Sequence, residues 1–160
     1  MSAIIIKAPE ALPVQRHKGV VYRSIFLAGS IEQGKAVDWQ KEVTEKVDCY
    51  VQYIFNPRRD KWDASLEQSI QNKVFNEQVS WEMTALDICD IIFMYFDPAT
   101  KSPISLLELG LYATSGKLIV CCPEGFWRKG NVEMVCDRYG IPLYTILPMA
   151  LDALERKILK

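Results

Sequence analysis

The stretch that decides the fold is residues 91–113, which read Ile-Ile-Phe-Met-Tyr-Phe-Asp-Pro-Ala-Thr-Lys-Ser-Pro-Ile-Ser-Leu-Leu-Glu-Leu-Gly-Leu-Tyr-Ala. Its opening apolar run is typical of a central parallel strand, which we place at Asp90–Phe96. A polar turn follows, in which Ser102 suits the N-cap of a helix and Pro103 its first position. The stretch therefore predicts a strand, a turn and a helix in close succession.

The predicted helix carries one charged side chain, Glu108, in a segment that is apolar almost all round from Ile104 to Ala113. A helix that is apolar on every face is normally buried. A carboxylate is rarely buried without a partner or a task. We therefore hypothesise that Glu108 is catalytic, as a nucleophile or a base. The alternative is an ion pair between Glu108 and an Arg or Lys of another element or subunit.

Strands and helices alternate along the rest of the chain, which predicts an α/β fold. We expect a flavodoxin-like or Rossmann-like doubly wound layer, with a mainly parallel five-stranded sheet and helices on both faces. Residues 1–23 are expected to form an N-terminal arm, with a short edge strand at Ala3–Lys7, and residues 24–160 a single domain. The other strands are expected at Ser24–Ser30, Tyr50–Phe55, Lys117–Cys122 and Ile141–Ile146. The other helices are expected at Ala36–Val47, Leu66–Leu86, Asn131–Tyr139 and Ala150–Leu159, the second either continuous or with a break near Lys73–Asn76.

The composition of the 160-residue chain limits the classes of ligand and partner that it is expected to bind. The net charge of −1 gives no electrostatic footprint for nucleic acid or an anionic membrane, and no apolar stretch reaches the roughly 18 residues of a membrane span. The only histidine, His17, argues against a His-based zinc site or a Ser-His-Asp triad. The five cysteines form no CxxC pair and are expected to be reduced thiols. We expect a cytoplasmic protein with a small-molecule ligand, no metal and no cofactor.

Polar loops follow four of the predicted strands. They are Ala28–Lys35, Asn56–Ser65, Asp97–Ser102 and Pro123–Gly130. In doubly wound sheets, ligands bind beyond the carboxyl ends of the strands, where the strand order reverses. The first loop has Gly29 and Gly34 but neither GxGxxG nor a Walker motif, which disfavours a dinucleotide or P-loop site. We therefore expect an active site of another kind at this edge.

A second acid, Glu82, falls near the end of the helix before residues 91–113. Two carboxylates about 5–5.5 Å apart would suit a retaining glycosyl transfer, one attacking the sugar and the other handling protons. The alternative is a solvated charge or a pair with Asp87 or Asp90.

The loop after the second predicted strand combines Arg58 and Arg59, which could hold phosphates or carboxylates, with Trp62, which could stack on a base. The alternative is internal Arg–Asp pairing with Trp62 closing the core. A further cluster, Phe126-Trp127-Arg128, suits a subunit interface better, and Asn131 could be only an N-cap.

Five segments occur in order: Phe26–Ile31, Asn56–Arg59, Trp81-Glu82 followed by Asp90, Leu107–Gly110, and Gly130–Met134. Together they resemble the nucleoside 2-deoxyribosyltransferase family, with the related nucleotide N-glycoside hydrolases. The resemblance covers most of residues 24–139.

The resemblance implies a flavodoxin-like fold and a double-displacement reaction. Glu108 matches the nucleophile that attacks C1′ of the deoxyribose, and Glu82 falls where the family usually has an Asp that helps to protonate the leaving base. Asn131 and Glu133 match a segment lent by a neighbouring subunit, which implies a homodimer or higher homo-oligomer with shared active sites. Where the family has an acid before the nucleophile, this chain has Ser102. The residues expected to contact substrate are Phe26, Gly29, Ser30, Asn56, Arg58, Arg59, Asp60, Trp62, Asp97, Ser102, Asn131 and Glu133.

Three functions remain open. The first is a transferase that exchanges bases on 2′-deoxyribonucleosides. The second is a hydrolase of nucleoside 5′-monophosphates, for which Arg58, Arg59 and Arg128 could hold the phosphate. The third is a nucleotide-binding module without catalysis.

Overall fold

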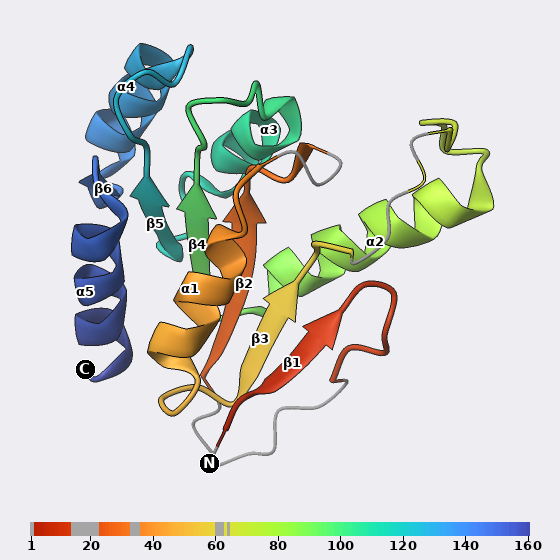
Figure 1. Ribbon diagram of the computed structural model, residues 1–160, viewed down its shortest axis with the longest axis horizontal. Coiled ribbons are helices and arrows are strands. Elements are labelled where there is room, and N and C mark those ends of the chain that lie inside the picture. The colour runs from red at the N-terminus through yellow and green to blue at the C-terminus, as the bar shows by residue number, and fades with distance from the viewer. Residues whose placement is uncertain (1, 14–22, 33–35, 60–62, 64) are drawn as a thin grey trace.

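The computed structural model describes residues 2–13, 23–32, 36–59, 63 and 65–160. Their strands form one parallel sheet in the order β1-β3-β2-β4-β5-β6 (Figure 1). The strands are β1 (Ile4–Lys7), β2 (Ser24–Gly29), β3 (Tyr53–Asn56), β4 (Ile91–Tyr95), β5 (Leu118–Cys121) and β6 (Leu143–Tyr144). The α/β, doubly wound prediction is confirmed.

The predicted count of five strands is wrong, because the described residues contain six. The additional strand is β1, the short edge strand expected at Ala3–Lys7. It pairs in parallel with β3, Ile4 opposite Tyr53 and Lys7 opposite Asn56. The sheet therefore includes part of the segment that we expected to be an arm.

Helices cover both faces of the sheet, as predicted. They are α1 (Trp39–Val47), α2 (Lys73–Ile88), α3 (Pro103–Tyr112), α4 (Lys129–Tyr139) and α5 (Leu147–Ile158). Side chains of α2, α3 and α4 share one apolar cluster with Phe26 and Ala28 of β2. Side chains of α1 and α5 share the other cluster with Ile25 and Leu27. Alternate residues of a strand point to opposite faces, so β2 contributes to both layers.

The start of α2 differs from the prediction. The helix begins at Lys73 and not at Leu66, because the Asn72 side chain caps it by accepting a hydrogen bond from Phe75 N at 3.0 Å. Such a cap satisfies one of the orphan N–H groups of the first turn. The preceding residues form turns, and none of the helices in the described part of the chain is long and apolar enough to cross a membrane.

The strand order reverses between β2 and β4. The connection from β2 through α1 leads to β3 on one side, and that from β4 through α3 leads to β5 on the other. The two strands touch closely here: a Cβ on Gly29, whose φ is +128°, would lie 2.2 Å from Tyr95 O. Folds of this kind bind ligands beyond the carboxyl ends of the strands where the order reverses, which in this sheet are the ends of β2 and β4.

At the opposite, amino end, β2 and β4 are joined by reciprocal hydrogen bonds. Ser24 N and Ser24 Oγ each donate to Asp90 Oδ2 at 2.9 Å. Asp90 N donates to Ser24 Oγ at 3.1 Å. These bonds fix the register of the two central strands.

The start of α3 places Ser102 at the N-cap and Pro103 at the first position, as predicted, but the Ser102 side chain makes no cap hydrogen bond. Ser102 has a φ of 46°, and its hydroxyl points to other hydroxyls. The carboxylate of Glu32 holds the turn that precedes the helix, because it accepts hydrogen bonds from Lys101 N and from Ser102 N.

The expectation that α3 is buried on every side is wrong for the single chain. Ser105 and Leu109 face the core, but Ile104, Leu107 and Leu111 are 59%, 59% and 60% exposed. We call these three residues the outer face of α3. The apolar pattern therefore reflects two surfaces, of which only one is covered within the described chain.

Candidate active site

Two half-buried acids, Glu108 on α3 and Glu82 on α2, form the centre of the candidate site. The side of α3 that carries Glu108 faces α2, since Tyr112, one turn later, donates a hydrogen bond to Asp87 Oδ1 at 2.6 Å. Burial raises the pKa of Glu108 to about 8, and the negative charge of Glu82 contributes to the same shift. The structure thus brings together the two residues predicted to be catalytic.

Glu82 has a more polar environment than Glu108. Burial raises its pKa, whereas a hydrogen bond from Gln78 and the positive charge of Arg59 lower it. Gln78 Nε2 donates to Glu82 Oε1 at 2.5 Å, and Arg59 Nε donates to Gln78 Oε1 at 2.5 Å. The two acids therefore differ in their hydrogen bonds and neighbouring charges. Such a difference in environment is a common basis for separate acid and nucleophile roles.

A cluster of three buried hydroxyls lies at the carboxyl ends of β2 and β4. Ser30 Oγ is 2.5 Å from Ser102 Oγ and 2.9 Å from Thr100 Oγ1, and the latter two are 2.8 Å apart. Asp97 N donates to Ser30 Oγ at 2.8 Å. The predicted residues Ser30, Asp97 and Ser102 are therefore adjacent, and Thr100 joins them.

Asp97 itself is buried and satisfied by the backbone. Its carboxylate accepts hydrogen bonds from Val37 N at 3.1 Å and from Ala99 N at 2.9 Å. It thereby connects the loop after β4 with the loop before α1. Phe26 is also buried, with its ring 6.3 Å from that of Trp81 beneath the site.

The loop after β3 uses its arginines within the protein. Arg58 donates to Ala36 O and Val37 O, both at 3.0 Å, and to Gln40 Oε1 at 3.2 Å. Asn56 Oδ1 accepts from Arg58 N at 2.9 Å. Arg58 therefore fixes the loop before α1, and Arg59 contacts Gln78 as described above. Asp60 and Trp62, predicted to contact substrate, lie outside the described residues.

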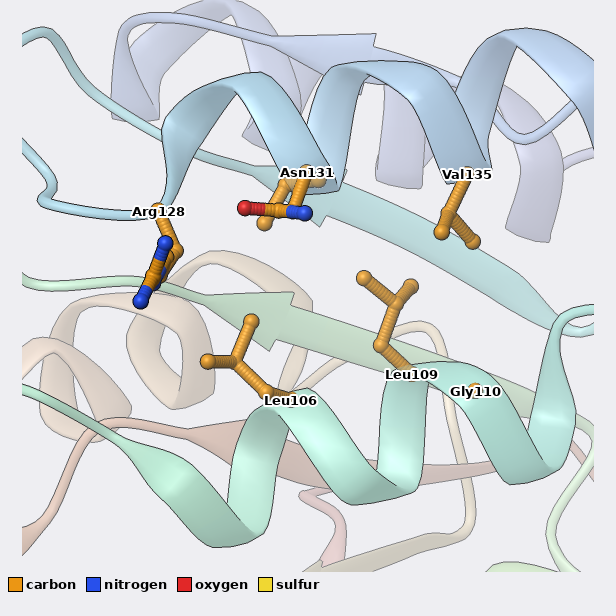
Figure 2. A pocket seen from close by; sticks show the side chains of 7 residues that line it. Leu106, Leu109, Gly110, Arg128, Asn131 and Val135 are labelled. Atoms are coloured by element: carbon orange, nitrogen blue, oxygen red, sulfur yellow. The ribbon is translucent and has the colours of Figure 1, made fainter.

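Asn131 lies on α4, away from the two acids. With Arg128 it lines a pocket of about 290 Å³ between α3 and α4. Figure 2 shows Leu106 and Leu109 pointing from α3 toward α4, with Arg128 at one end. Glu108 does not line this pocket, because residues two positions apart on a helix, such as Leu106 and Glu108, face different sides.

Glu133, the other predicted residue of α4, is exposed and bonded to Lys129 Nζ. Within one chain, Asn131 and Glu133 therefore lie on the α4 side of α3, and the two acids lie on the α2 side.

Trp127 connects two loops at the rim of the sheet. Its Nε1 donates to Lys101 O at 2.9 Å. Its ring lies between the Lys101 ammonium at 4.7 Å and the Arg128 guanidinium at 4.3 Å. Its neighbour Phe126 is a core residue, and the centroid of its ring lies 4.8 Å from that of the Phe96 ring.

Among the described residues, no three His, Cys, Asp or Glu side chains are grouped so that they could hold a metal ion. All five cysteines are free, and all but Cys49 are buried.

Sequence reasoning missed Gln78, Thr100 and Glu32. Of these, only Gln78 had a usable signal, because it precedes Glu82 by four residues and so lies on the same side of α2.

The chain is an α/β protein in which two interacting carboxyl groups lie on helices α2 and α3. Residues 22–126 match the model of a protein family described as nucleoside 2-deoxyribosyltransferase like. The match spans well over half of the chain, which therefore belongs to this family. It includes Glu82 and Glu108 and ends before Asn131 and Glu133. No curated protein matches the chain.

Proposed function

We propose that the protein exchanges nucleobases on 2′-deoxyribonucleosides through a covalent deoxyribosyl–Glu108 intermediate. The observation that carries this proposal is the half-buried pair of acids, in which burial and then the charge of Glu82 raise the pKa of Glu108. Paired carboxyl groups suit glycosyl transfer because one attacks the anomeric carbon and the other handles the proton of the leaving group.

The reaction needs one proton, and the pair can supply it. Burial and the charge of Glu82 raise the pKa of Glu108 to about 8, so at neutral pH this carboxyl carries a proton. Glu108 must lose that proton to attack C1′. Glu82 is the neighbouring carboxylate that accepts it and passes it to the base nitrogen as the N-glycosidic bond breaks. A second base then attacks C1′, returns its proton to Glu82 and releases Glu108.

A nucleoside fits the site better than a nucleoside 5′-monophosphate. Arg58 donates to backbone and amide oxygens, and Arg59 donates to Gln78. A helix N-terminus attracts phosphate, but the carboxylate of Glu32 lies just before the start of α3, where it accepts hydrogen bonds from Lys101 N and Ser102 N. A negative charge at this position disfavours a second anion.

One observation favours the alternative, a monophosphate N-glycosidase. Lys101 and Arg128 flank Trp127 at the rim of the sheet, and neither forms an ion pair with an acid in the described part of the chain. These two cations could hold a phosphate in place of the engaged arginines.

The outer face of α3 suits a contact with a second copy of the chain. Ile104, Leu107 and Leu111 are apolar and more than half exposed, and contiguous apolar surface of this kind marks interaction sites. In a homo-oligomer, a neighbouring copy would cover this face and could bring its Asn131 or Glu133 to Glu108. The free cysteines suit a reducing compartment such as the cytoplasm.

The test is to incubate the protein with a 2′-deoxyribonucleoside and a second free base and to separate the products by chromatography. We expect a new deoxynucleoside, and mass spectrometry of quenched protein should find deoxyribose on the peptide that contains Glu108. Glu108→Ala should abolish both signals, whereas Glu77→Gln, an exposed change on α2, should leave them unchanged. Free base without any new nucleoside would refute transfer, and faster cleavage of the 5′-monophosphate would favour the glycosidase.

A further inference from the structure

A buried glutamine links the loop after β3 to one of the two acids. Gln78 lies on α2 and is 5% exposed. Its Oε1 accepts a hydrogen bond from Arg59 Nε at 2.5 Å, and its Nε2 donates to Glu82 Oε1 at 2.5 Å and to Pro57 O at 3.4 Å. Both ends of the amide are therefore engaged.

Arg59 determines which way this amide points. A guanidinium has only donors, so the side of Gln78 that faces it must be the oxygen. The NH₂ group then has to face Glu82 and Pro57. A flip of the amide would place donor against donor at Arg59 and oxygen against oxygen at Glu82. The direction of the hydrogen bond to Glu82 is thus fixed by a residue of the neighbouring loop.

The neutral amide has a consequence for proton transfer. A direct ion pair with Arg commonly lowers the pKa of a carboxyl by about 1–3 units, which would hold it ionised. A hydrogen bond from an amide holds the carboxylate in place with a weaker preference for the charged form. Among the described residues no ion pair joins Arg59 to Glu82, and the amide lies between them. Glu82 therefore keeps its orientation while it remains able to accept and release a proton.

We propose that Gln78 is the positioning residue of the site, which orients Glu82 for proton transfer to the leaving base and makes that orientation depend on Arg59. This inference rests on the proposed function. It assigns to Arg59 a role through Gln78 in place of direct contact with substrate. It also predicts that a shift of Arg59 in the loop after β3 acts first on the orientation and proton transfer of Glu82, and on Glu108 only through Glu82.

The variant Gln78→Met keeps the length of the side chain and removes its hydrogen bonds with Arg59, Glu82 and Pro57. With an ordinary deoxynucleoside we expect kcat to fall about 10- to 100-fold, less than the roughly 10²–10⁴-fold that general acid–base catalysis contributes because Glu82 itself is retained, while KM changes less than about threefold. With 2-deoxyribosyl fluoride, whose leaving group needs no proton from an acid, the loss should be at least fivefold smaller. The matched control is Gln71→Met, an exposed glutamine outside the site.

Two further measurements keep the inference testable. Arg59→Met breaks the same chain of hydrogen bonds from the loop and should reproduce the leaving-group dependence, even if Gln78→Met folds poorly. An NMR titration of the Glu82 carboxyl should show a higher pKa in either variant than in the wild type, because Gln78→Met removes the donor to the charged form and Arg59→Met removes a positive charge that favours it.

Equal losses with the nucleoside and the fluoride, or an unchanged titration of Glu82, would overturn the assignment of Gln78. A wild-type protein that exchanges no bases, but whose Glu82 titration moves in both variants, would overturn the proposed function and leave the positioning of Glu82 by Gln78 in place.

Discussion

Replacing Glu108 by Gln should stabilise the protein in a manner that depends on pH. Burial and the charge of Glu82 raise the pKa of Glu108 from an ordinary 4.5 to about 8. Between these two values the folded protein holds the proton and the unfolded chain does not. The free energy of unfolding of the wild type therefore falls as pH rises through this window, by up to roughly 1.4 kcal/mol per unit. The amide that Glu108→Gln introduces cannot ionise, so the variant escapes this loss.

The full window corresponds to about 5 kcal/mol. Glu108 is only half-buried, and solvent screens part of the penalty, so we expect roughly half, about 2–3 kcal/mol, at pH 9. For a chain of this size, 1 kcal/mol shifts Tm by about 2–4 °C. Glu108→Gln should thus melt about 5–10 °C above the wild type at pH 9 and close to it at pH 4.5. Scanning calorimetry at five or six pH values measures this difference directly.

A control with the opposite sign is available in Glu155. Hydrogen bonds from Lys46 and Tyr50 lower the pKa of Glu155, and Lys46 Nζ lies 2.8 Å from its carboxylate. This group stabilises the fold above its ordinary pKa, and the stabilisation is lost as pH falls through the lowered value. Glu155→Gln should therefore lower Tm at pH 9 and not at acid pH. A Tm difference for Glu108→Gln that stays constant from pH 4.5 to pH 9 would refute the reasoning about the buried acid.

Three other predictions concern the frame of the site. Gly29→Ala should lower the free energy of unfolding by roughly 3 kcal/mol or more, because the added Cβ would lie 2.2 Å from Tyr95 O. A Tm within about 2 °C of that of the wild type would contradict this prediction. Leu107→Glu places a charge on the outer face of α3 and should reduce the mass measured by light scattering to that of one chain; a wild type that is already monomeric argues against the interface. Glu32→Gln removes the negative charge at the start of α3 and should raise the rate with a 5′-monophosphate relative to the nucleoside, and an unchanged ratio would exclude this role for Glu32.

The fold was largely predictable because the central strands can be recognised from the sequence alone. Apolar runs such as Ile91–Met94 identify strands that are buried on both faces. The edge strand β1 was harder to count, since Ile4 and Ile5 are about half exposed and the partner strand lies far along the chain. The start of α2 was misplaced because Leu66 and Ile70 have helical spacing, whereas the Asn72 cap decides where the helix begins.

The site was predictable where a charge stood out from its surroundings. Glu108 was found because it is the only charge in an apolar helix. Gln78 was not found, although its spacing of four residues before Glu82 places it on the same side of α2, because its other partner, Arg59, lies on a separate loop. Ser102 was correctly placed at the start of α3, but the direction of its hydroxyl depends on Ser30, which is distant in sequence. Apolar periodicity also cannot distinguish a face covered by the core from one left for another molecule.

The bonds between Ser24 and Asp90 have a consequence for how the protein folds. They join residues 66 positions apart, and every strand pair in the sheet is parallel, so none can form as a local hairpin. Folding must close long loops before the central strands stabilise one another, which favours a slow search. Glu82 and Glu108 flank β4 in sequence, and β4 enters the sheet between β2 and β5. The two acids therefore meet only when the middle of the sheet is complete, and a nascent chain that ends before α3 has no site at all.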